Sequence, residues 1–218
     1  MKLDVPRYKN FNNYSCFVTT VAMVLRYFGK PINQKKVFEK AKVYHPKDKD
    51  RIFGCTVPSI MLALKNEGYK MIAWHDKDIQ GIKKAGKETE LFFNIWEKQI
   101  REAEKIGVLE SHKNGKFSLI KKYLNKGVPV IVGIKSKTFY EGNPFWENSI
   151  YNKKWPEDTN HVVVITSYKK GYYLYNDSSP FLQGDKGKNM KVSEHKLKKA
   201  WEDAAYVKNA VFILEKIK

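Results

Sequence analysis

The chain has 218 residues, of which 42% are hydrophobic and 14% aromatic, enough for a buried core, and this excludes an intrinsically disordered protein. Its 41 Lys and Arg residues against 23 Asp and Glu residues give a formal net charge of +18 at pH 7. Because the basic residues are spread along the whole chain and match no nucleic-acid-binding motif, we interpret them as solvated surface and predict no specific nucleic-acid partner.

The first part of the chain is predicted to be mainly helical. The run SCFVTTVAMVLRYFG has the apolar periodicity of a buried helix, with Ser15 as its N-cap and Gly29 as its stop signal. A second helix begins after Asn33 and continues as far as Tyr44. A third has Thr56 as its cap and is followed by a strand, YKMIAW.

The segment that follows differs from its neighbours. In ETELFFNIWEKQIREAEKIG, the residues Leu91, Ile95 and Ile100 share one stripe, and charged residues fill most other positions. This pattern predicts a long amphipathic helix packed on the body of the protein. The run FSLIKKYLNKG predicts a short helix after it.

Further along, the hydrophobic period changes to that of strands. VPVIVGI, HVVVITSY and GYYLYND are β-branched and aromatic runs, and the KKG between the last two is typical of a hairpin turn. One more helix, from about Ser193 to Trp201, precedes a final strand, NAVFILEKI.

These elements predict the α+β class, with helices first and antiparallel strands second. We expect a single domain over residues 1–218. Its mainly helical lobe covers 1–125, with a helical insertion at about 76–115, and its mainly β lobe covers 126–218.

Cys16 lies in the first turn of the most hydrophobic predicted helix. A helix N-terminus carries partial positive charge and free N–H groups, and both stabilise a thiolate, the reactive form of cysteine. A structural cysteine can occupy the same position, so this placement alone does not decide the role of Cys16.

His161 begins the strand HVVVITSY, and Asp177 ends the next strand of the predicted hairpin, in YLYNDSSP. Antiparallel pairing puts the start of one strand beside the end of the other. The carboxylate can then orient the imidazole while the other ring nitrogen faces a thiol. Each residue alone is explained by a strand edge or a turn, and their joint placement favours a catalytic site.

At this point the sequence resembles the papain-like bacteriocin-leader (double-glycine) peptidases and their stand-alone peptidase-like relatives. The resemblance rests on DVPRYKNFNNYSC with the following VAMVLRYFG, on GCTVPSIMLALKNEGY, on YLNKGVPVIVGI and above all on HVVVITSYKKGYYLYNDSSP. It implies a papain-like cysteine peptidase fold and a thiol hydrolase with a peptide or protein substrate. It also implies Cys16 as nucleophile, His161 as general base and Asp177 as the residue that orients the base.

Two positions depart from the family pattern. Asn10 stands where the family usually has a Gln, whose amide helps to form the oxyanion hole, so the resemblance makes Asn10 a candidate oxyanion donor on a shorter side chain. An ordinary loop residue is the other interpretation of Asn10. Phe17 stands where the family normally has Gly directly after the cysteine, and this predicts a crowded site or a changed access for the substrate.

We therefore expect a cysteine peptidase that cleaves peptide or amide bonds through a thioester acyl-enzyme. One alternative is an acyltransferase or amide-forming enzyme on the same fold. Another is a catalytically degenerate domain that binds a peptide, which the two departures support. A nucleic-acid-binding module has the least support.

The other chemical signals are weak. Cys16 and Cys55 are too few for a disulfide scaffold, although one disulfide between them stays open. No metal or cofactor is predicted, because no ligand-like spacing links the histidines His45, His75, His112 and His195. The charged start MKLDVPRYKN and the short apolar runs predict a cytoplasmic protein without a signal peptide or transmembrane segment. The loop KTFYEGNPFWENSIYNKKWPEDTN, directly before His161, is a candidate substrate lid or a surface insertion.

Overall fold

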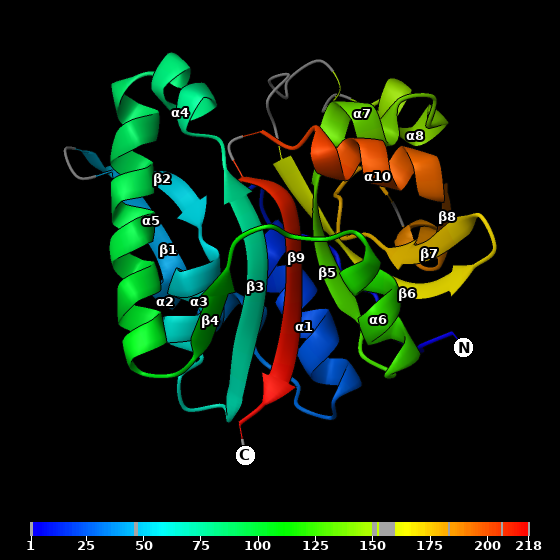
Figure 1. Cartoon of the computed structure of the whole chain (residues 1–218), viewed down its shortest axis with the longest axis horizontal. Coiled ribbons are helices and arrows are strands. Elements are labelled where there is room, and N and C mark those ends of the chain that lie inside the picture. Colours follow the sequence, from blue (N-terminus) through cyan, green and yellow to red (C-terminus); the bar gives the residue numbers. More distant parts are fainter. Residues whose placement is uncertain are drawn as a thin grey trace.

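A computed structural model describes residues 2–45, 48–149, 152, 160–182, 184–205 and 207–217. Its centre is a seven-stranded sheet in the order β4-β3-β9-β5-β6-β7-β8 (Figure 1). All neighbouring strands pair antiparallel except β3 and β4, which pair in parallel. The strands are β3 (Tyr69–Lys77), β4 (Leu109–His112), β5 (Val130–Lys135), β6 (Asn160–Lys169), β7 (Tyr172–Asn176), β8 (Met190–Ser193) and β9 (Val207–Lys216).

Helices cover both faces of this sheet. In Figure 1, α1 lies behind the sheet, whereas α6 and α10 lie in front of it. The helical elements are α1 (Cys16–Tyr27), α2 (Gln34–Ala41), α3 (Val57–Ala63), α4 (Ile79–Ala85), α5 (Lys87–Lys105), α6 (Ser118–Asn125), α7 (Ser136–Tyr140), α8 (Pro144–Glu147), η1 (Gly184–Gly187) and α10 (Glu194–Glu202). Among these described elements, no helix combines the length and the apolar character needed to cross a membrane.

Helix α1 is the central helix of the core and packs on β6 and β9. Every residue from Phe17 to Leu25 is buried, as its nearly continuous apolar sequence predicts. Ser15 occupies the predicted N-cap position, but its side chain makes no capping hydrogen bond to the helix. Its hydroxyl instead accepts hydrogen bonds from the backbone N–H groups of Phe11 and Asn12, so Ser15 orders the loop that leads into α1.

The hairpin that was predicted around KKG is confirmed. Strands β6 and β7 pair antiparallel with Lys169 opposite Tyr172 at the turn. Gly171 has a φ of +81°, a left-handed conformation that glycine adopts without steric cost. The predicted helix before the last strand is also confirmed as α10, and Ser193 caps it by accepting a hydrogen bond from the Lys196 N–H.

Two predictions about the first half of the chain were wrong. The helix expected to reach Tyr44 ends at Ala41, and the next four residues form β1 (Lys42–His45), which pairs with β2 (Asp48–Cys55). Pairing between strands gives the backbone of this β-branched and aromatic segment its hydrogen-bond partners.

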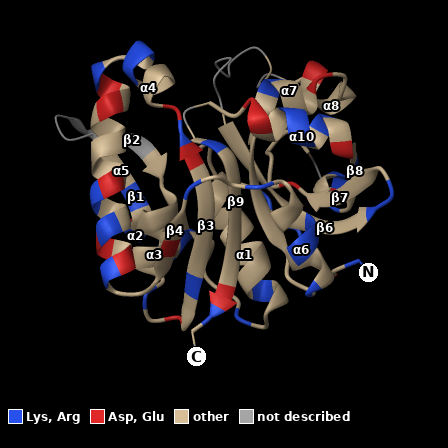
Figure 2. Ribbon diagram, in the orientation of Figure 1, with Lys and Arg blue, Asp and Glu red and all other residues tan. Residues whose placement is uncertain are grey.

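The first half is also less purely helical than expected. Strands β3 and β4 belong to the same sheet as the strands of the second half. The segment at 76–115 therefore contributes to the body of the fold, because it supplies α5 and the edge strand β4. Helix α5 carries both acidic and basic residues along its length (Figure 2).

The burial of α1 gives a direct test of this architecture. Leu25→Ala is expected to lower the free energy of unfolding by about 2–5 kcal/mol, because it leaves a cavity in a closely packed core. Arg26→Ala, at an exposed position on the same helix, is the control and is expected to change it by less than about 0.5 kcal/mol. Urea unfolding followed by circular dichroism measures both, and equal effects would contradict a buried α1.

Candidate active site

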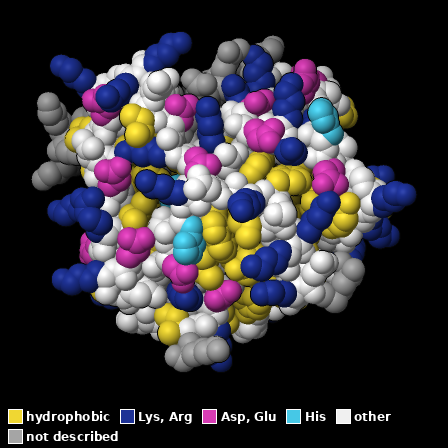
Figure 3. Space-filling view, viewed as in Figure 1, with side chains coloured by type: hydrophobic (Ala, Val, Ile, Leu, Met, Phe, Trp, Pro, Cys, Tyr) yellow, Lys and Arg dark blue, Asp and Glu magenta, His cyan; other side chains and the backbone are white. Residues whose placement is uncertain are grey.

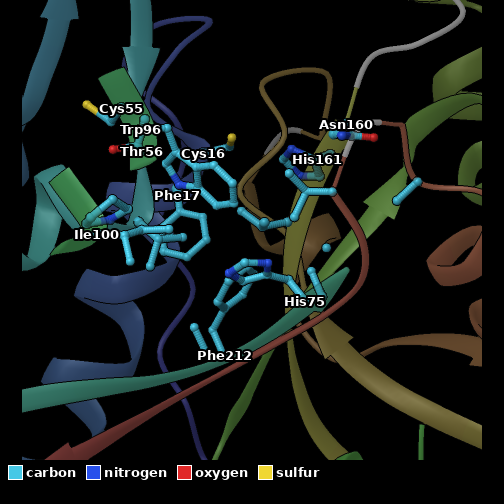
Figure 4. A pocket seen from close by; sticks show the side chains of 18 of the residues that line it. Cys16, Phe17, Cys55, Thr56, His75, Trp96, Ile100, Asn160, His161 and Phe212 are labelled. Carbon is cyan, nitrogen blue, oxygen red and sulfur yellow. The ribbon is translucent and has the colours of Figure 1, made fainter. Parts of the chain in front are cut away.

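Cys16 is the first residue of α1 and is only half-buried, whereas the residues after it are buried. Cys16 therefore lies at the helix start, where the backbone N–H groups are unpaired and the partial positive charge of the helix is largest. Figure 4 shows the Cys16 sulfur on the side of His161, and the sulfur of Cys55 lies further away. Both cysteines are free thiols.

His161 lies on β6 and contacts Asp177, the residue that follows β7. The imidazole Nε2 donates to Asp177 Oδ1 over 3.0 Å, and the two side chains are 3% and 0% exposed. Val164 lies opposite Asn176 in the antiparallel pairing of β6 with β7. The start of β6, with His161, therefore lies beside Asp177, the residue after β7. Cys16 is a further hydrogen-bond partner of the His161 side chain. The structure thus brings together the three residues that the sequence pattern singled out.

Three hydrogen-bond donors contact the Asp177 carboxylate. Oδ1 accepts from His161 and from the Ser179 N–H at 2.8 Å, and Oδ2 accepts from the Tyr140 hydroxyl at 2.7 Å. The Ser179 hydroxyl lies 2.9 Å from the Tyr140 hydroxyl and 3.2 Å from His161 Nε2. A buried carboxylate needs such partners, because an unpaired buried charge costs several kcal/mol.

Sequence reasoning missed Tyr140 and Ser179. A signal for Ser179 exists, since an Asp side chain commonly accepts from the N–H two residues further along the chain. No local pattern could reveal Tyr140, which lies at the end of α7 and is 37 residues away from Asp177.

The site has a defined charge distribution. Burial opposes a charge on His161, but the Asp177 charge and hydrogen bond outweigh this effect and raise the pKa of His161 from its usual value to about 10. Burial likewise disfavours the Asp177 carboxylate, yet the charge of His161 and the surrounding donors lower the pKa of Asp177. The pair is therefore an ion pair at neutral pH.

The loop after β7 is held by the N-terminal segment. Arg7 Nε donates to the carbonyl of Asp177 at 2.9 Å, and Nη2 donates to the carbonyl of Leu182 at 2.8 Å. The Asp177 N–H in turn donates to the carbonyl of Gly187 at 2.8 Å. A Cβ atom at Gly187 would lie 2.6 Å from the Asp177 carbonyl oxygen, so only glycine fits this close approach.

Asn10 lies on the same N-terminal segment and is half-buried. Its backbone N–H donates to the carbonyl of Ser178 at 2.8 Å, which fixes it beside the Asp177 loop. Its side-chain oxygen is buried and accepts no hydrogen bond from the described part of the chain. This unpaired atom is a hydrogen-bond acceptor, so the donors of the Asn10 amide are its two N–H groups.

A cavity of about 210 Å³ adjoins Cys16 and His161 (Figure 4). Phe17 lines it, and its ring packs edge-on against Phe212 with 5.0 Å between the centroids. The phenyl group after the nucleophile is therefore part of the cavity wall. Cys55 also lines the cavity, and burial, together with the nearby Cys16, raises its pKa to about 12.

Other candidate features are described only in part. The first residues of the candidate lid form α7 and α8, and Tyr140 and Trp146 of these helices are buried. The rest of the lid, at 150–151 and 153–159, lies outside the described residues. Within the described ranges, no group of three or more His, Cys, Asp or Glu side chains is placed to hold a metal ion. On the face in Figure 3, Lys and Arg side chains are scattered among acidic and hydrophobic ones.

The comparisons with known proteins show the family of the chain. The model of the Peptidase_C39-like family matches residues 2–209, so the chain belongs to this family. The family and the fold are those of cysteine peptidases with a papain-like architecture. Among the curated proteins that were compared, none matches the chain significantly.

Three solved structures similar to this chain illustrate the comparison, and those with TM-scores above 0.5 share its fold. The peptidase domain of Streptococcus ComA, a bifunctional ABC transporter, matches with a TM-score of 0.52 at 11% identity, over 96% of this chain and 97% of that chain. A protein described as a C39-like peptidase from Bacillus anthracis matches with a TM-score of 0.51 at 16% identity, over 100% of both chains. A double glycine motif protease from an AMS/PCAT transporter, in complex with a leader peptide, has a TM-score of 0.47 at 14% identity, over 99% of this chain and 94% of that chain.

The ion pair makes a prediction about pH. Because the pKa of His161 is raised and that of Asp177 is lowered, the pair stabilises the fold fully between about pH 4 and about pH 6.5, loses this contribution as the pH rises through about 10, and also loses it in strong acid as Asp177 is protonated. Asp177→Asn removes the negative charge and is expected to lower the pKa of His161, so that the imidazole is neutral at a lower pH. A titration of the His161 ring by NMR measures the shift.

Asp185→Asn is the matched control, because Asp185 is exposed and does not hydrogen-bond His161. An unchanged His161 titration in Asp177→Asn would show that the carboxylate does not hold the imidazolium.

Proposed function

We propose that this chain hydrolyses peptide or amide bonds with Cys16 as nucleophile, His161 as general base and acid, and Asp177 as the residue that orients His161. The observation that carries this proposal is the buried pair of His161 and Asp177, whose Nε2–Oδ1 distance is 3.0 Å. Because Nε2 is occupied by this pair, Nδ1 is the nitrogen available to Cys16. The start of α1 supplies the electrostatic support for a thiolate.

The reaction follows from these positions. In the resting site the Cys16 proton is already on His161 Nδ1, and the thiolate attacks the scissile carbonyl carbon to form a tetrahedral oxyanion. His161 returns the proton to the leaving amine as the C–N bond breaks, which leaves a thioester on Cys16. Water then attacks the thioester, His161 takes its proton, and the acid product leaves as the Cys16 thiolate is regenerated beside the imidazolium.

The oxyanion needs hydrogen-bond donors aimed at it. The Cys16 N–H is one of the unpaired donors at the start of α1. The side-chain NH2 group of Asn10 supplies the second donor in this proposal, because the backbone N–H of Asn10 fixes this segment on Ser178 beside the Asp177 loop.

Tyr140 and Ser179 are positioning residues in this proposal. They hydrogen-bond Asp177, and Ser179 also contacts His161 Nε2. These contacts hold the carboxylate and the imidazole in position relative to each other. Neither side chain lines the cavity beside Cys16. Their effect on the reaction is therefore through His161.

The thiolate is tested by alkylation. We expect iodoacetamide to modify Cys16 rapidly at pH 6, where ordinary thiols are mostly protonated, because His161 carries a positive charge there. His161→Ala is expected to slow this reaction at least about tenfold. Cys55 in the same sample is the internal control and should react slowly, since its pKa is raised to about 12. Mass spectrometry of the two cysteine peptides gives both rates.

The activity itself is tested with a mixture of fluorogenic peptides as substrates. Cys16→Ala is expected to abolish cleavage, and Cys55→Ala is expected to retain it. An ordinary reactivity of Cys16, or cleavage that persists in Cys16→Ala, would overturn the proposed mechanism and favour the degenerate binding domain.

The oxyanion donor makes a separate prediction. Asn10→Ala is expected to lower kcat for a cleaved peptide by about 10²–10³-fold, because one donor to the transition state is lost. The rate of iodoacetamide labelling at Cys16 should stay the same, since this reaction forms no oxyanion. Asn12→Ala, two residues away, is the control for the loop, and equal kcat losses in both variants would assign Asn10 a structural role.

A further inference from the structure

We propose that the cavity beside Cys16 is a specificity pocket that binds a bulky apolar side chain of the acyl part of the substrate. This inference rests on the proposed peptidase activity and adds its substrate class. Cys16, Phe17 and His161 lie in the wall of the cavity, so an acyl group bonded to the Cys16 sulfur lies next to it.

The wall is built mainly of apolar side chains. They come from several elements that are distant in the sequence, with α5 supplying a continuous group. The cavity residues of α5 are Phe92, Phe93, Trp96 and Ile100, and β9 contributes Val207 and Phe212. Covering such a surface with another apolar group is favourable by about 25 cal/mol per Å² of buried area.

The polar side chains of the wall make hydrogen bonds within the protein, although His75 Nδ1 has no hydrogen-bond partner among the described residues. The Thr56 hydroxyl donates to Gln99 Oε1 at 2.8 Å, and His75 Nε2 pairs with the Ser111 hydroxyl at 3.1 Å. Burial lowers the pKa of His75, so this ring is neutral at pH 7, and its Nδ1 is buried. Apart from the reacting pair of Cys16 and His161, the wall therefore offers a ligand no charge. A charged substrate side chain would lose its hydration without compensation.

The size of the cavity selects a large group. Its volume is about 210 Å³, and a cavity of about 150 Å³ is large enough for benzene. A phenylalanine or leucine side chain can therefore fill much of the space, whereas glycine would leave it empty. The phenyl group of Phe17 narrows the space beside the nucleophile and gives an aromatic side chain a ring to pack against.

The test uses tripeptide acyloxymethyl ketones, which alkylate a catalytic thiolate as the carboxylate leaves. In each probe one position carries Phe, Leu, Gly or Asp, and the other two carry Ala. We expect Phe or Leu at one position to label Cys16 at least about tenfold faster than Gly at that position, and Asp to be slower still. If the Phe, Leu and Gly probes label Cys16 at equal rates at all three positions, or if the Gly probe is faster, the proposed pocket is overturned.

Variants of the cavity wall then test whether the cavity causes the preference for the Phe probe. Ile100→Trp narrows the cavity and is expected to remove most of the advantage of the Phe probe over the Gly probe. Ile106→Trp is the matched control, because Ile106 adjoins the end of α5, is 48% exposed and does not line the cavity. If Ile100→Trp does not fold, Phe92→Ala tests the same wall by enlarging it, with an expected shift towards a Trp probe. A full Phe advantage in the folded cavity variant would overturn the assignment of the wall.

Iodoacetamide labelling in parallel separates the two proposals. Rapid reaction of wild-type Cys16 with iodoacetamide but no preference among the probes contradicts the pocket and leaves the proposed peptidase chemistry intact. Slow reaction with iodoacetamide as well as with every probe contradicts the peptidase chemistry, and the pocket inference falls with it.

Discussion

The buried ion pair between His161 and Asp177 is the interaction on which the site depends. Removing both charges from water is costly, and such a pair is stable only when hydrogen bonds replace the lost hydration. Tyr140 and Ser179 provide these hydrogen bonds, and Arg7 holds the loop through the Asp177 carbonyl. The N-terminal segment, α7 and the β6–β7 hairpin are therefore tied together at one point.

This arrangement also explains why the site lies between a helix start and a sheet. Helix α1 is buried almost completely, so its first residue can be accessible only where the core ends, and Cys16 occupies that position. The hairpin brings the imidazole to the same place. Helix α5 then closes one side with apolar residues, so that the surroundings of Cys16 are charged on the side of His161 and apolar on the other.

Local sequence patterns were reliable where one physical requirement dominated. The apolar run of α1, the glycine turn between β6 and β7, and the start of α10 near Ser193 each have a local cause, and all three were predicted. Prediction failed where pairing with another strand decided the conformation of a segment. Lys42–His45 is a strand because β2 lies beside it, and β4 extends the sheet because it reaches the edge of β3.

By itself the sequence determined the main helices, the hairpin, the α+β class and the three residues proposed for catalysis. These follow from hydrophobic period, turn residues and motif order, which act over short distances along the chain. Only the tertiary structure decided that Tyr140 completes the Asp177 site and that Phe17 belongs to a cavity wall with α5. Their roles depend on burial and hydrogen bonding between segments that fold together, and no local pattern encodes which distant segments meet.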